Sequence, residues 1–284
     1  METVSTREFC DRAYALFHHP AYVSPDPLEV VREYQRLADR EVIGLIASSL
    51  ALGRVDGIVR AVRGVVARLR DGSASPADVV ACESLSGLRV RCEGFRYRFF
   101  DAEQLYGLLL GIRSVLVRHG SIEACFGEGV TRLWPARDPS DVAVAGLGFL
   151  VDAVAGGSGG RLDRSILLAH PVRESACKRL MLYLRWLVRR DEIDPGGWQV
   201  VGPESLIIPV DTHVLRVARA LGIATRSQAT LSVAREITTA MRLLCPEDPV
   251  RYDFCLTRPG IHPMLDEAGW LAGRPAGGRF SRTA

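Results

Sequence analysis

The chain has 284 residues, which is long enough for one large domain or two smaller ones with cores of their own. Its composition, 48% hydrophobic and 24% charged, is that of a globular protein and excludes a fibrous or intrinsically disordered chain. The formal net charge of +3 is small, so the composition also excludes a strongly basic or strongly acidic protein.

The N-terminal half of the sequence repeats its apolar residues with the period of an α-helix in most segments. The exception is residues 87–98, whose β-branched and aromatic residues predict a β-hairpin. The glycine-rich loop 156–160 follows no predicted strand and lacks a GK[ST] motif, so we interpret it as a connector rather than a phosphate-binding loop. Helices are predicted at 39–52, 58–69, 103–117 and 142–155.

The C-terminal half is also predicted to be helical, apart from irregular turns at 193–209. In the most regular of its helices, Lys178, Arg185 and Arg189 are spaced i, i+7 and i+11 and share one face. Asp248 is expected to be the N-cap of another helix, with proline as its first residue. The predicted helices are 174–190, 211–222, 231–244 and 248–258.

The seven cysteines are scattered and contain no CxxC pair, which argues for buried free thiols in a reducing compartment. The same pattern argues against a zinc site, and we expect no metal and no other cofactor. The first twenty residues lack the basic-then-apolar pattern of a signal peptide. The longest apolar run, 42–52, is too short to cross a bilayer, so we expect a cytoplasmic protein without membrane association.

Lys178 is the only lysine among 36 lysine and arginine residues. Arginine cannot replace a nucleophilic lysine because its guanidinium stays protonated, whereas a lysine amine that loses its proton can form a Schiff base. Composition alone leaves a second interpretation open, in which one lysine lies by chance on a solvated helix.

The segment 161–235 contains twelve basic and seven acidic residues, which suits a polyanion such as nucleic acid but also a solvated helix face.

Asp211 is the second informative residue, because an apolar run delivers its carboxylate to the first position of a predicted helix. As an isolated residue it would be interpreted as an N-cap and nothing more. The stretch PVDTHVLRV (209–217), however, resembles the helix-hairpin-helix DNA glycosylases, the superfamily of endonuclease III and the 8-oxoguanine DNA glycosylases. The resemblance implies that Asp211 is the essential aspartate of that superfamily, at the N-terminus of a helix.

In bifunctional members of that superfamily a lysine upstream of the aspartate attacks the sugar, and Lys178 is the residue that fits. Its spacing from the aspartate is closer to that in the archaeal 8-oxoguanine DNA glycosylases than to that in endonuclease III. The stretches SACKR (175–179) and LRW (184–186) look like an uncharacterised, DUF2400-like bacterial family near that group, and this resemblance covers nearly the whole chain. The helical segment around 43–69 resembles the superfamily's opening helix-turn-helix, whose turn lies near the DNA, and this makes Ser48, Ser49 and Arg54 candidate DNA contacts.

The combination of Lys178 and Asp211 also makes chemical sense without the family resemblance. Cleavage of an N-glycosidic bond builds positive charge on the sugar, which a fixed Asp211 carboxylate would stabilise. The same carboxylate could take the proton of the attacking amine of Lys178. We expect Arg179 and Arg185 to lie near this amine, to disfavour its charged form, and to bind nucleic acid.

The residues of a base pocket are harder to assign. Trp186 and Trp198 could stack on a flipped base, although aromatic residues beside an apolar stripe are more often core. Asp253 could hydrogen-bond a purine edge, with an intrahelical partner for a neighbouring arginine as the alternative. The segment Arg96–Arg98 is interpreted equally well as a solvated hairpin or as a phosphate contact.

Two features of the superfamily are missing from this chain. No Leu-Pro-Gly-Val-Gly hairpin is present between 201 and 210, so arginine side chains would have to replace its grip on DNA. Only two cysteines follow Asp211, so the four-cysteine loop of endonuclease III is absent and we expect no iron–sulfur cluster.

We therefore predict an all-α fold with two helical lobes and a central cleft, similar to a DNA glycosylase. Residues 1–38 and 200–270 are assigned to a terminal lobe, 39–199 to a central lobe, and 271–284 to a disordered tail. The predicted function is that of a monomeric DNA glycosylase with AP-lyase activity on damaged duplex DNA, with an oxidised purine as the expected base. The alternatives are a non-catalytic nucleic-acid-binding module and a monofunctional glycosylase that activates water.

Overall fold

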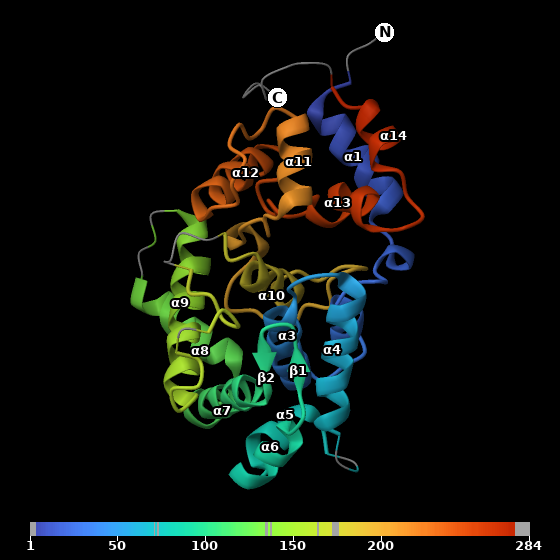
Figure 1. Cartoon of the computed structure of the whole chain (residues 1–284). Helices are drawn as coiled ribbons and strands as arrows, with labels where there is room; N and C mark the ends of the chain where they lie inside the picture. The colour runs from blue at the N-terminus through green and yellow to red at the C-terminus, as the bar shows by residue number, and fades with distance from the viewer. Residues whose placement is uncertain are drawn as a thin grey trace.

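The computed structural model describes residues 4–70, 72, 74–133, 136, 138–163, 165–171 and 176–275. Within these residues the chain forms fourteen α-helices, two short 3-10 turns and one two-stranded sheet, so the predicted all-α class is confirmed (Figure 1). The helices are α1 (Thr6–Phe17), α2 (Leu28–Val31), α3 (Leu37–Leu50), α4 (Val55–Arg68), α5 (Pro76–Cys82), α6 (Leu85–Cys92), α7 (Ala102–His119), α8 (Ile122–Leu133), α9 (Pro139–Gly157), α10 (Lys178–Val188), α11 (Thr212–Ala220), α12 (Leu231–Leu244), α13 (Asp253–Ile261) and α14 (Glu267–Ala272).

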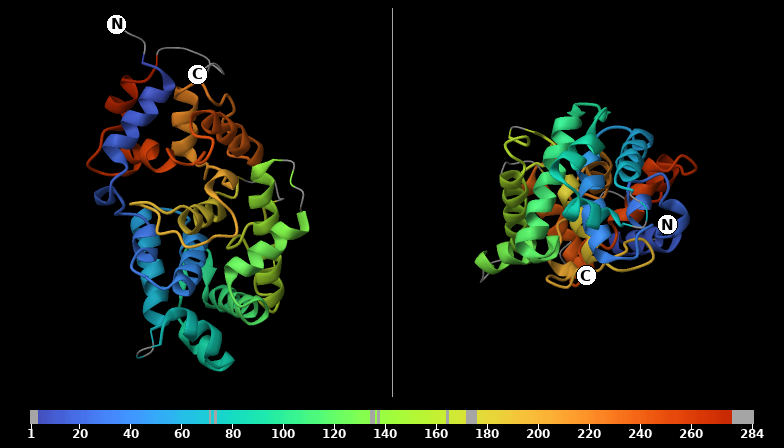
Figure 2. Two further views of the ribbon diagram at one scale, coloured as in Figure 1. Left: turned by 180° about the vertical axis from the view of Figure 1, so that it is seen from behind. Right: turned by 90° about the horizontal axis from the view of Figure 1, so that it is seen from below.

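The helices form two groups, which Figures 1 and 2 show from the front and from behind. The first group contains α1 and α11–α14, so the first and last helices of the chain lie side by side. Phe9 of α1 and Trp270 of α14 place their ring centroids 4.7 Å apart. The second group contains α2–α10, with α10 packed on α3 and with α7, α8 and α9 packed on one another. One apolar core runs through both groups.

Helix α9 is long and apolar enough to cross a bilayer by length and composition, the only such helix among the described residues. Half of its most apolar window is buried inside this structure. The core helix of a soluble protein has the same properties, so α9 by itself is weak evidence for a membrane span.

Six of the predicted helices occur within a few residues of their expected bounds, namely α3, α4, α7, α9, α11 and α12. These segments have a helical apolar period, and a side chain caps the N-terminus of α7, α9, α11 and α12. Helix α9, for example, begins at an Asp138 capping box followed by proline.

The hairpin predicted at 87–98 is wrong over most of its length. The hydroxyl of Ser84 accepts a hydrogen bond from the amide N–H of Gly87 at 2.9 Å and starts α6, which extends to Cys92. Only β1 (Arg96–Tyr97) and β2 (Phe100–Asp101) form an antiparallel pair, which lies outside the predicted range except for its first strand. N-capping therefore outweighs the β propensity of this segment.

Three further predictions are corrected. Helix α10 begins at Lys178 rather than at 174, because the preceding Cys177 is left-handed; residues 172–175 lie outside the described residues. Helix α13 begins at Asp253 rather than at Asp248, whose carboxylate binds Arg189 instead of capping a helix. The tail predicted to be disordered starts inside α14, which ends at Ala272, and residues 276–284 lie outside the described residues.

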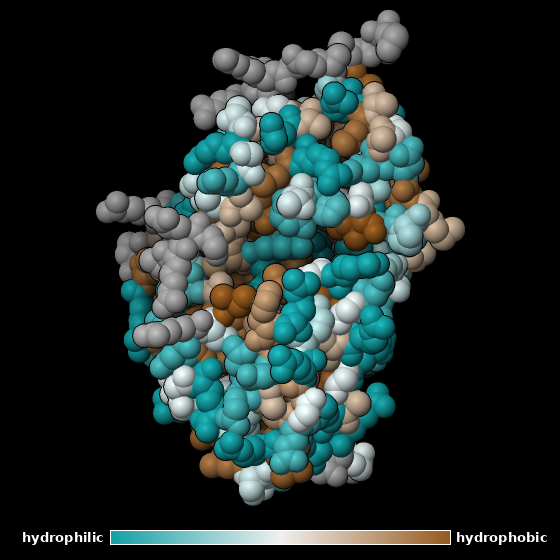
Figure 3. All heavy atoms as spheres, in the orientation of Figure 1, coloured by the Kyte–Doolittle hydropathy of each residue, from teal (hydrophilic) through white to brown (hydrophobic). Residues whose placement is uncertain are grey.

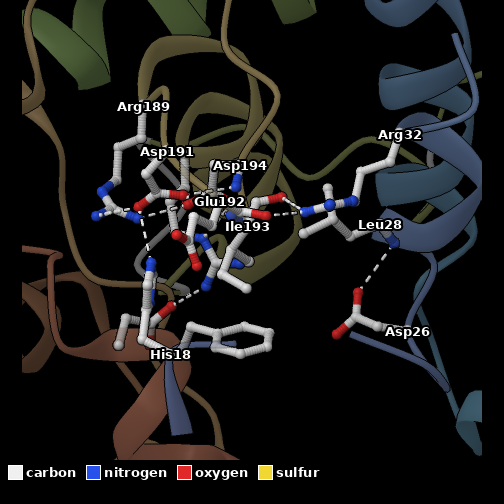
Figure 4. A network of polar contacts seen from close by, with 12 residues as sticks. His18, Asp26, Leu28, Arg32, Arg189, Asp191, Glu192, Ile193 and Asp194 are labelled. Carbon is white, nitrogen blue, oxygen red and sulfur yellow. Dashed lines mark hydrogen bonds and ion pairs between the residues drawn. The ribbon is translucent and has the colours of Figure 1, made fainter. Parts of the chain in front are cut away.

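A buried cluster of charged side chains joins the two groups of helices (Figure 4). Arg185 of α10 donates from Nε to Oδ1 of Asp194 at 3.2 Å and from Nη1 to Asp253 at the start of α13. Arg189 donates from Nη1 to the other oxygen of Asp194 at 2.6 Å. We call this set the arginine–aspartate cluster; its members are His18, Arg185, Arg189, Asp191, Asp194, Asp248 and Asp253.

The arginine–aspartate cluster satisfies charges that would be costly if left alone. Asp194 is fully buried, and both of its oxygens accept hydrogen bonds from guanidinium groups. Asp191 connects Arg189 at 2.8 Å to His18 at 3.0 Å, and His18 follows α1 in the other group of helices. A buried ion-pair network of this kind contributes little net stability, but the loss of one partner leaves an uncompensated buried charge.

We expect Arg185→Ala to lower the free energy of unfolding by about 3–5 kcal/mol, because Asp194 and Asp253 would lose their buried partner. Urea unfolding followed by circular dichroism measures this loss. Arg54→Ala, at an exposed position before α4, is the control and should change the same quantity by less than about 0.5 kcal/mol. Equal stability of the two variants would contradict the structural role of the cluster.

Candidate active site

Lys178 and Asp211 lie 33 positions apart in sequence and meet at the N-termini of two helices. Lys178 is the first residue of α10, and Asp211 is the N-cap of α11. The Nζ atom of Lys178 donates to Oδ2 of Asp211 at 2.7 Å. The tertiary structure thus brings together the two residues that the sequence singled out for chemistry.

The two carboxylate oxygens of Asp211 have separate tasks. Oδ1 accepts hydrogen bonds from the backbone N–H groups of His213 at 2.9 Å and Val214 at 3.0 Å, which is N-cap geometry. Oδ2 is left to face Lys178. The N-cap interpretation and the catalytic interpretation of Asp211 are therefore compatible, because each uses a different oxygen.

The surroundings of Asp211 favour its charged form. Burial by itself would raise the pKa of this carboxyl, but the Lys178 ammonium and the amide of Val214 outweigh burial and hold the pKa below its usual value. The N-terminus of α11 adds partial positive charge at the same place. Asp211 is thus an anion fixed beside a primary amine, with 20% of its side chain exposed.

Backbone strain occurs immediately before the amine. Cys177 has φ 44° and ψ 36°, which is left-handed backbone, and it serves as the N-cap of α10 without a side-chain hydrogen bond. Among the described residues, only Cys177 and Arg98 are non-glycine residues with positive φ. Such backbone is costly for a residue with a side chain and is enriched at functional sites.

A pocket of about 380 Å³ opens beside Lys178. The amine is partly accessible, with 38% of its side chain exposed. The buried Oγ of Ser49 has no hydrogen-bond partner within the described part of the chain. The pocket is otherwise mostly apolar, and its lining residues are Ser49, Ala51, Leu52, Leu167, Ala169, Ala176, Cys177, Lys178, Arg179, Leu180, Val210 and Ala229.

A larger hollow of about 790 Å³ lies beside the start of α12. The described residues of its lining include Arg226 and Arg235, and none of these described residues carries a carboxylate or a lysine amine. We therefore place the candidate active site at the smaller pocket, where the amine and the carboxylate meet. Among the residues that the structure describes, no three His, Cys, Asp or Glu side chains gather to form a possible metal site.

Arg179 lies next to the pair, as expected. Its guanidinium donates to the backbone carbonyl oxygens of Ser49 and Ile166, and no carboxylate pairs with it in the described part of the chain. Burial lowers the pKa of Arg179. This cation therefore fastens α10 to the end of α3 and lies beside the pocket without a carboxylate partner.

Arg185 does not lie where the sequence interpretation put it. Its guanidinium is buried in the arginine–aspartate cluster, where Asp194 and Asp253 balance its charge. It is therefore not available to disfavour the charged form of the Lys178 amine or to contact a phosphate. Asp253 is buried as its partner, and the hypothesis that this carboxylate binds a purine edge is corrected. Arg185 thus lies on the predicted helix, but ion pairs with residues outside that helix determine where its side chain points.

The two predicted stacking tryptophans are core residues. Trp186 is completely buried, and Trp198 is buried with its Nε1 donating to Glu41 at 2.9 Å. Neither lines the pocket beside Lys178. The alternative interpretation, in which aromatic residues beside an apolar stripe belong to the core, is the right one for both.

The predicted contacts at the end of α3 and on the turn after it are placed differently by the structure. Ser48 and Ser49 are buried, and the hydroxyl of Ser48 donates to the carbonyl oxygen of Leu45 at 3.1 Å, so neither residue is exposed for contact with the DNA backbone. Ser49 instead lines the pocket. Arg54 is exposed at the start of α4 and remains a candidate contact.

The structure defines an all-α protein with a lysine–aspartate pair at the mouth of a pocket. The model of the family described as "Protein of unknown function (DUF2400)" matches residues 26–262, and the chain belongs to this family. The match includes Lys178 and Asp211. No curated protein and no solved structure matches the chain.

The pair predicts a specific pH dependence of stability. The pKa of the Asp211 carboxyl is lower in the folded protein than in the unfolded chain, so this group stabilises the fold above about pH 4 and loses that effect as the pH falls further. Asp211→Asn keeps an N-capping side chain but removes the charge. At pH 7 we expect its melting temperature to be lower by about 2–4 °C, since a partly exposed ion pair is worth at most about 1 kcal/mol.

As the pH falls below about 4, the carboxyl of the unfolded chain takes up a proton before that of the folded protein, so the difference between the two proteins should narrow steadily. Thermal unfolding of both proteins from pH 7 to pH 3 checks this. A constant difference over the whole range would show that Lys178 does not stabilise the charged carboxylate.

Proposed function

We propose that this protein is a DNA N-glycosylase with AP-lyase activity that removes a damaged base from duplex DNA. The observation that carries the proposal is the 2.7 Å contact between the Lys178 amine and the Asp211 carboxylate beside a pocket. The sequence supports it independently, since Lys178 is the only lysine and Asp211 lies in a stretch that resembles the catalytic stretch of DNA glycosylases.

In the proposed reaction, Oδ2 of Asp211 accepts a proton from Lys178 and leaves a neutral amine. The nitrogen lone pair forms a bond to C1′ of the sugar, while the electrons of the C1′–N bond leave with the base, which takes up a proton. That proton comes from Asp211, and the carboxylate so restored stabilises the positive charge that develops on the sugar. Transfer of a proton from the amine nitrogen to O4′ opens the sugar ring and gives a Schiff base on Lys178. Loss of a proton from C2′ then expels the 3′-phosphate and cleaves the strand.

The pocket suits a base that has left the double helix. At about 380 Å³ it lies within the range of small-molecule sites, and a target atom inside a duplex cannot reach Lys178 without base flipping. No aromatic side chain is among the described residues that line it, so the base would be held by apolar contacts, the Ser49 hydroxyl and Arg179. An oxidised purine such as 8-oxoguanine is the first lesion to test.

One observation favours a monofunctional glycosylase as the second candidate. The 2.7 Å contact between Lys178 and Asp211 has the geometry of an ion pair, and an ammonium group has no lone pair with which to attack. Asp211 could then activate water, with Lys178 as a fixed cation. The two candidates differ in whether a covalent intermediate forms.

Sodium borohydride should trap a covalent complex between the protein and a duplex that contains the right lesion. The chain offers two primary amines only, those of Lys178 and of the N-terminal Met1. We expect Lys178→Arg to abolish trapping while lesion binding stays within about tenfold, because arginine keeps the charge and cannot form a Schiff base. Denaturing gels of the trapped complex, over a panel of damaged duplexes, measure this.

The matched control moves the amine by one residue. In the double variant Lys178→Arg, Arg179→Lys the composition is unchanged, but the amine no longer lies against Asp211. Trapping should stay absent in this variant. A Lys178→Arg protein that still nicks damaged DNA at the wild-type rate would exclude Lys178 as nucleophile, and base release without trapping in the wild type would favour the monofunctional candidate.

DNA binding should weaken steeply with salt, because each phosphate that the protein neutralises releases counterions. Arg54→Ala should lower the slope of log K against log salt by about one unit. Arg118→Ala is the control, since Arg118 is also exposed but lies at the far end of α7. Fluorescence anisotropy from 50 to 200 mM salt checks the slopes. Equal slopes for the two variants would remove Arg54 from the interface.

A further inference from the structure

The tip of the β-hairpin presents an aromatic side chain to solvent. Tyr97 pairs with Phe100 in the two-stranded sheet, so Arg98 and Phe99 form a two-residue loop. Arg98 has φ 52°, a left-handed backbone that is costly for arginine. Phe99 is 68% exposed, whereas Phe100 next to it is buried and anchors the hairpin.

The hairpin is seated at the rim of the pocket. The hydroxyl of Tyr97 donates to the carbonyl oxygen of Leu52 at 2.8 Å, and Leu52 also lines the pocket. Arg98 lies over Gly53, where an added Cβ atom would be 2.5 Å from the guanidinium nitrogen Nη1. Glycine at this position, with φ 112°, therefore allows the hairpin tip to approach the turn between α3 and α4.

The neighbours of Phe99 do not bury it. Its one ring contact in the described structure is with Arg98, whose Cζ lies 5.5 Å from the ring centroid. A strained turn that projects an aromatic ring and a cation into solvent does not serve the core of this protein. Exposed apolar groups with a polar surround are typical of binding surfaces.

Exposed cations lie near the tip. Arg54, Arg96 and Arg98 are exposed, and none of them has an ion-pair partner within the described ranges of the chain, although Asp101 lies opposite Arg96 in the hairpin. Figure 3 shows the molecule in the orientation of Figure 1, with a recess between the two groups of helices and both hydrophilic and hydrophobic side chains at its rim. An exposed apolar ring with exposed guanidinium groups on the same hairpin fits the chemistry of a nucleic-acid duplex, with phosphates outside and stacked bases within.

We propose that Phe99 is the wedge that enters the base stack of duplex DNA when a base is turned into the pocket beside Lys178. The proposal rests on the function proposed above and assigns its DNA-opening element. Insertion of the ring replaces the stacking that the departing base gives up, and Arg96 and Arg98 bind the phosphates on either side. The hairpin is the right element because its seat on Leu52 places it at the rim of the same pocket.

The test separates base unstacking from chemistry. The probe is a duplex with a stable tetrahydrofuran abasic site and 2-aminopurine as the neighbouring base, whose fluorescence rises when it unstacks. Wild-type protein should raise this fluorescence, and Phe99→Ala should abolish the rise. Phe99→Leu should retain most of it, because leucine also acts as an apolar wedge.

The control is Val117→Ala, which removes a side chain that is 72% exposed on α7, about 22 Å along that helix from the hairpin. It should behave as wild type. In single-turnover excision, Phe99→Ala should be slower by about tenfold or more on a fully paired lesion and near wild type on the same lesion in single-stranded DNA.

The outcomes distinguish the two proposals. If Phe99→Ala cleaves paired lesions and unstacks 2-aminopurine as the wild type does, the wedge is excluded and the glycosylase function stands. If no lesion is excised but the fluorescence rise depends on Phe99, the wedge stands and the glycosylase is excluded. If the protein shows no duplex binding but binds anionic vesicles through Phe99, the surface belongs to a membrane and the wedge is overturned.

Discussion

The buried arginine–aspartate cluster is the interaction on which the rest of the structure depends. Arg185 and Arg189 project from α10, while Asp253 begins α13 in the other group of helices. Their charges can stay buried only if the two groups remain together, because each guanidinium needs carboxylates from outside its own helix. The cluster therefore fixes α10 relative to the C-terminal helices, and with it the position of Lys178 against Asp211.

Asp211 shows how one residue serves both folding and chemistry. One oxygen caps α11 through two backbone N–H groups, and the other contacts the Lys178 amine. The cap holds the carboxylate in one orientation, which reduces the conformational freedom that would otherwise be lost when a substrate binds. A fixed anion beside a primary amine is the arrangement that the proposed glycosylase reaction requires. Helix α11 keeps its N-cap in this arrangement, because the cap uses the other oxygen.

The pocket and the hairpin at its rim each contain one non-glycine residue with left-handed backbone. Cys177 precedes Lys178, and Arg98 precedes Phe99, and these are the only non-glycine residues with positive φ among those described. Tertiary contacts compensate for both strained positions: α10 is tied to α3 through Arg179, and the hairpin is tied to the same region through Tyr97. The end of α3 thus supports both the proposed nucleophile and the proposed wedge.

The sequence by itself determined the helical class, most long helices and the two residues of the central pair. These are local properties, since apolar period, capping and the motif around Asp211 are all contained in short segments. The short helix α6 was not predicted, because a single N-cap decided between two weak local preferences. Only the tertiary structure decided that Arg185 and Trp198 are buried and that Phe99 is not. Burial depends on partners such as Asp253 and Glu41, which are 68 and 157 positions away, and no local pattern contains them.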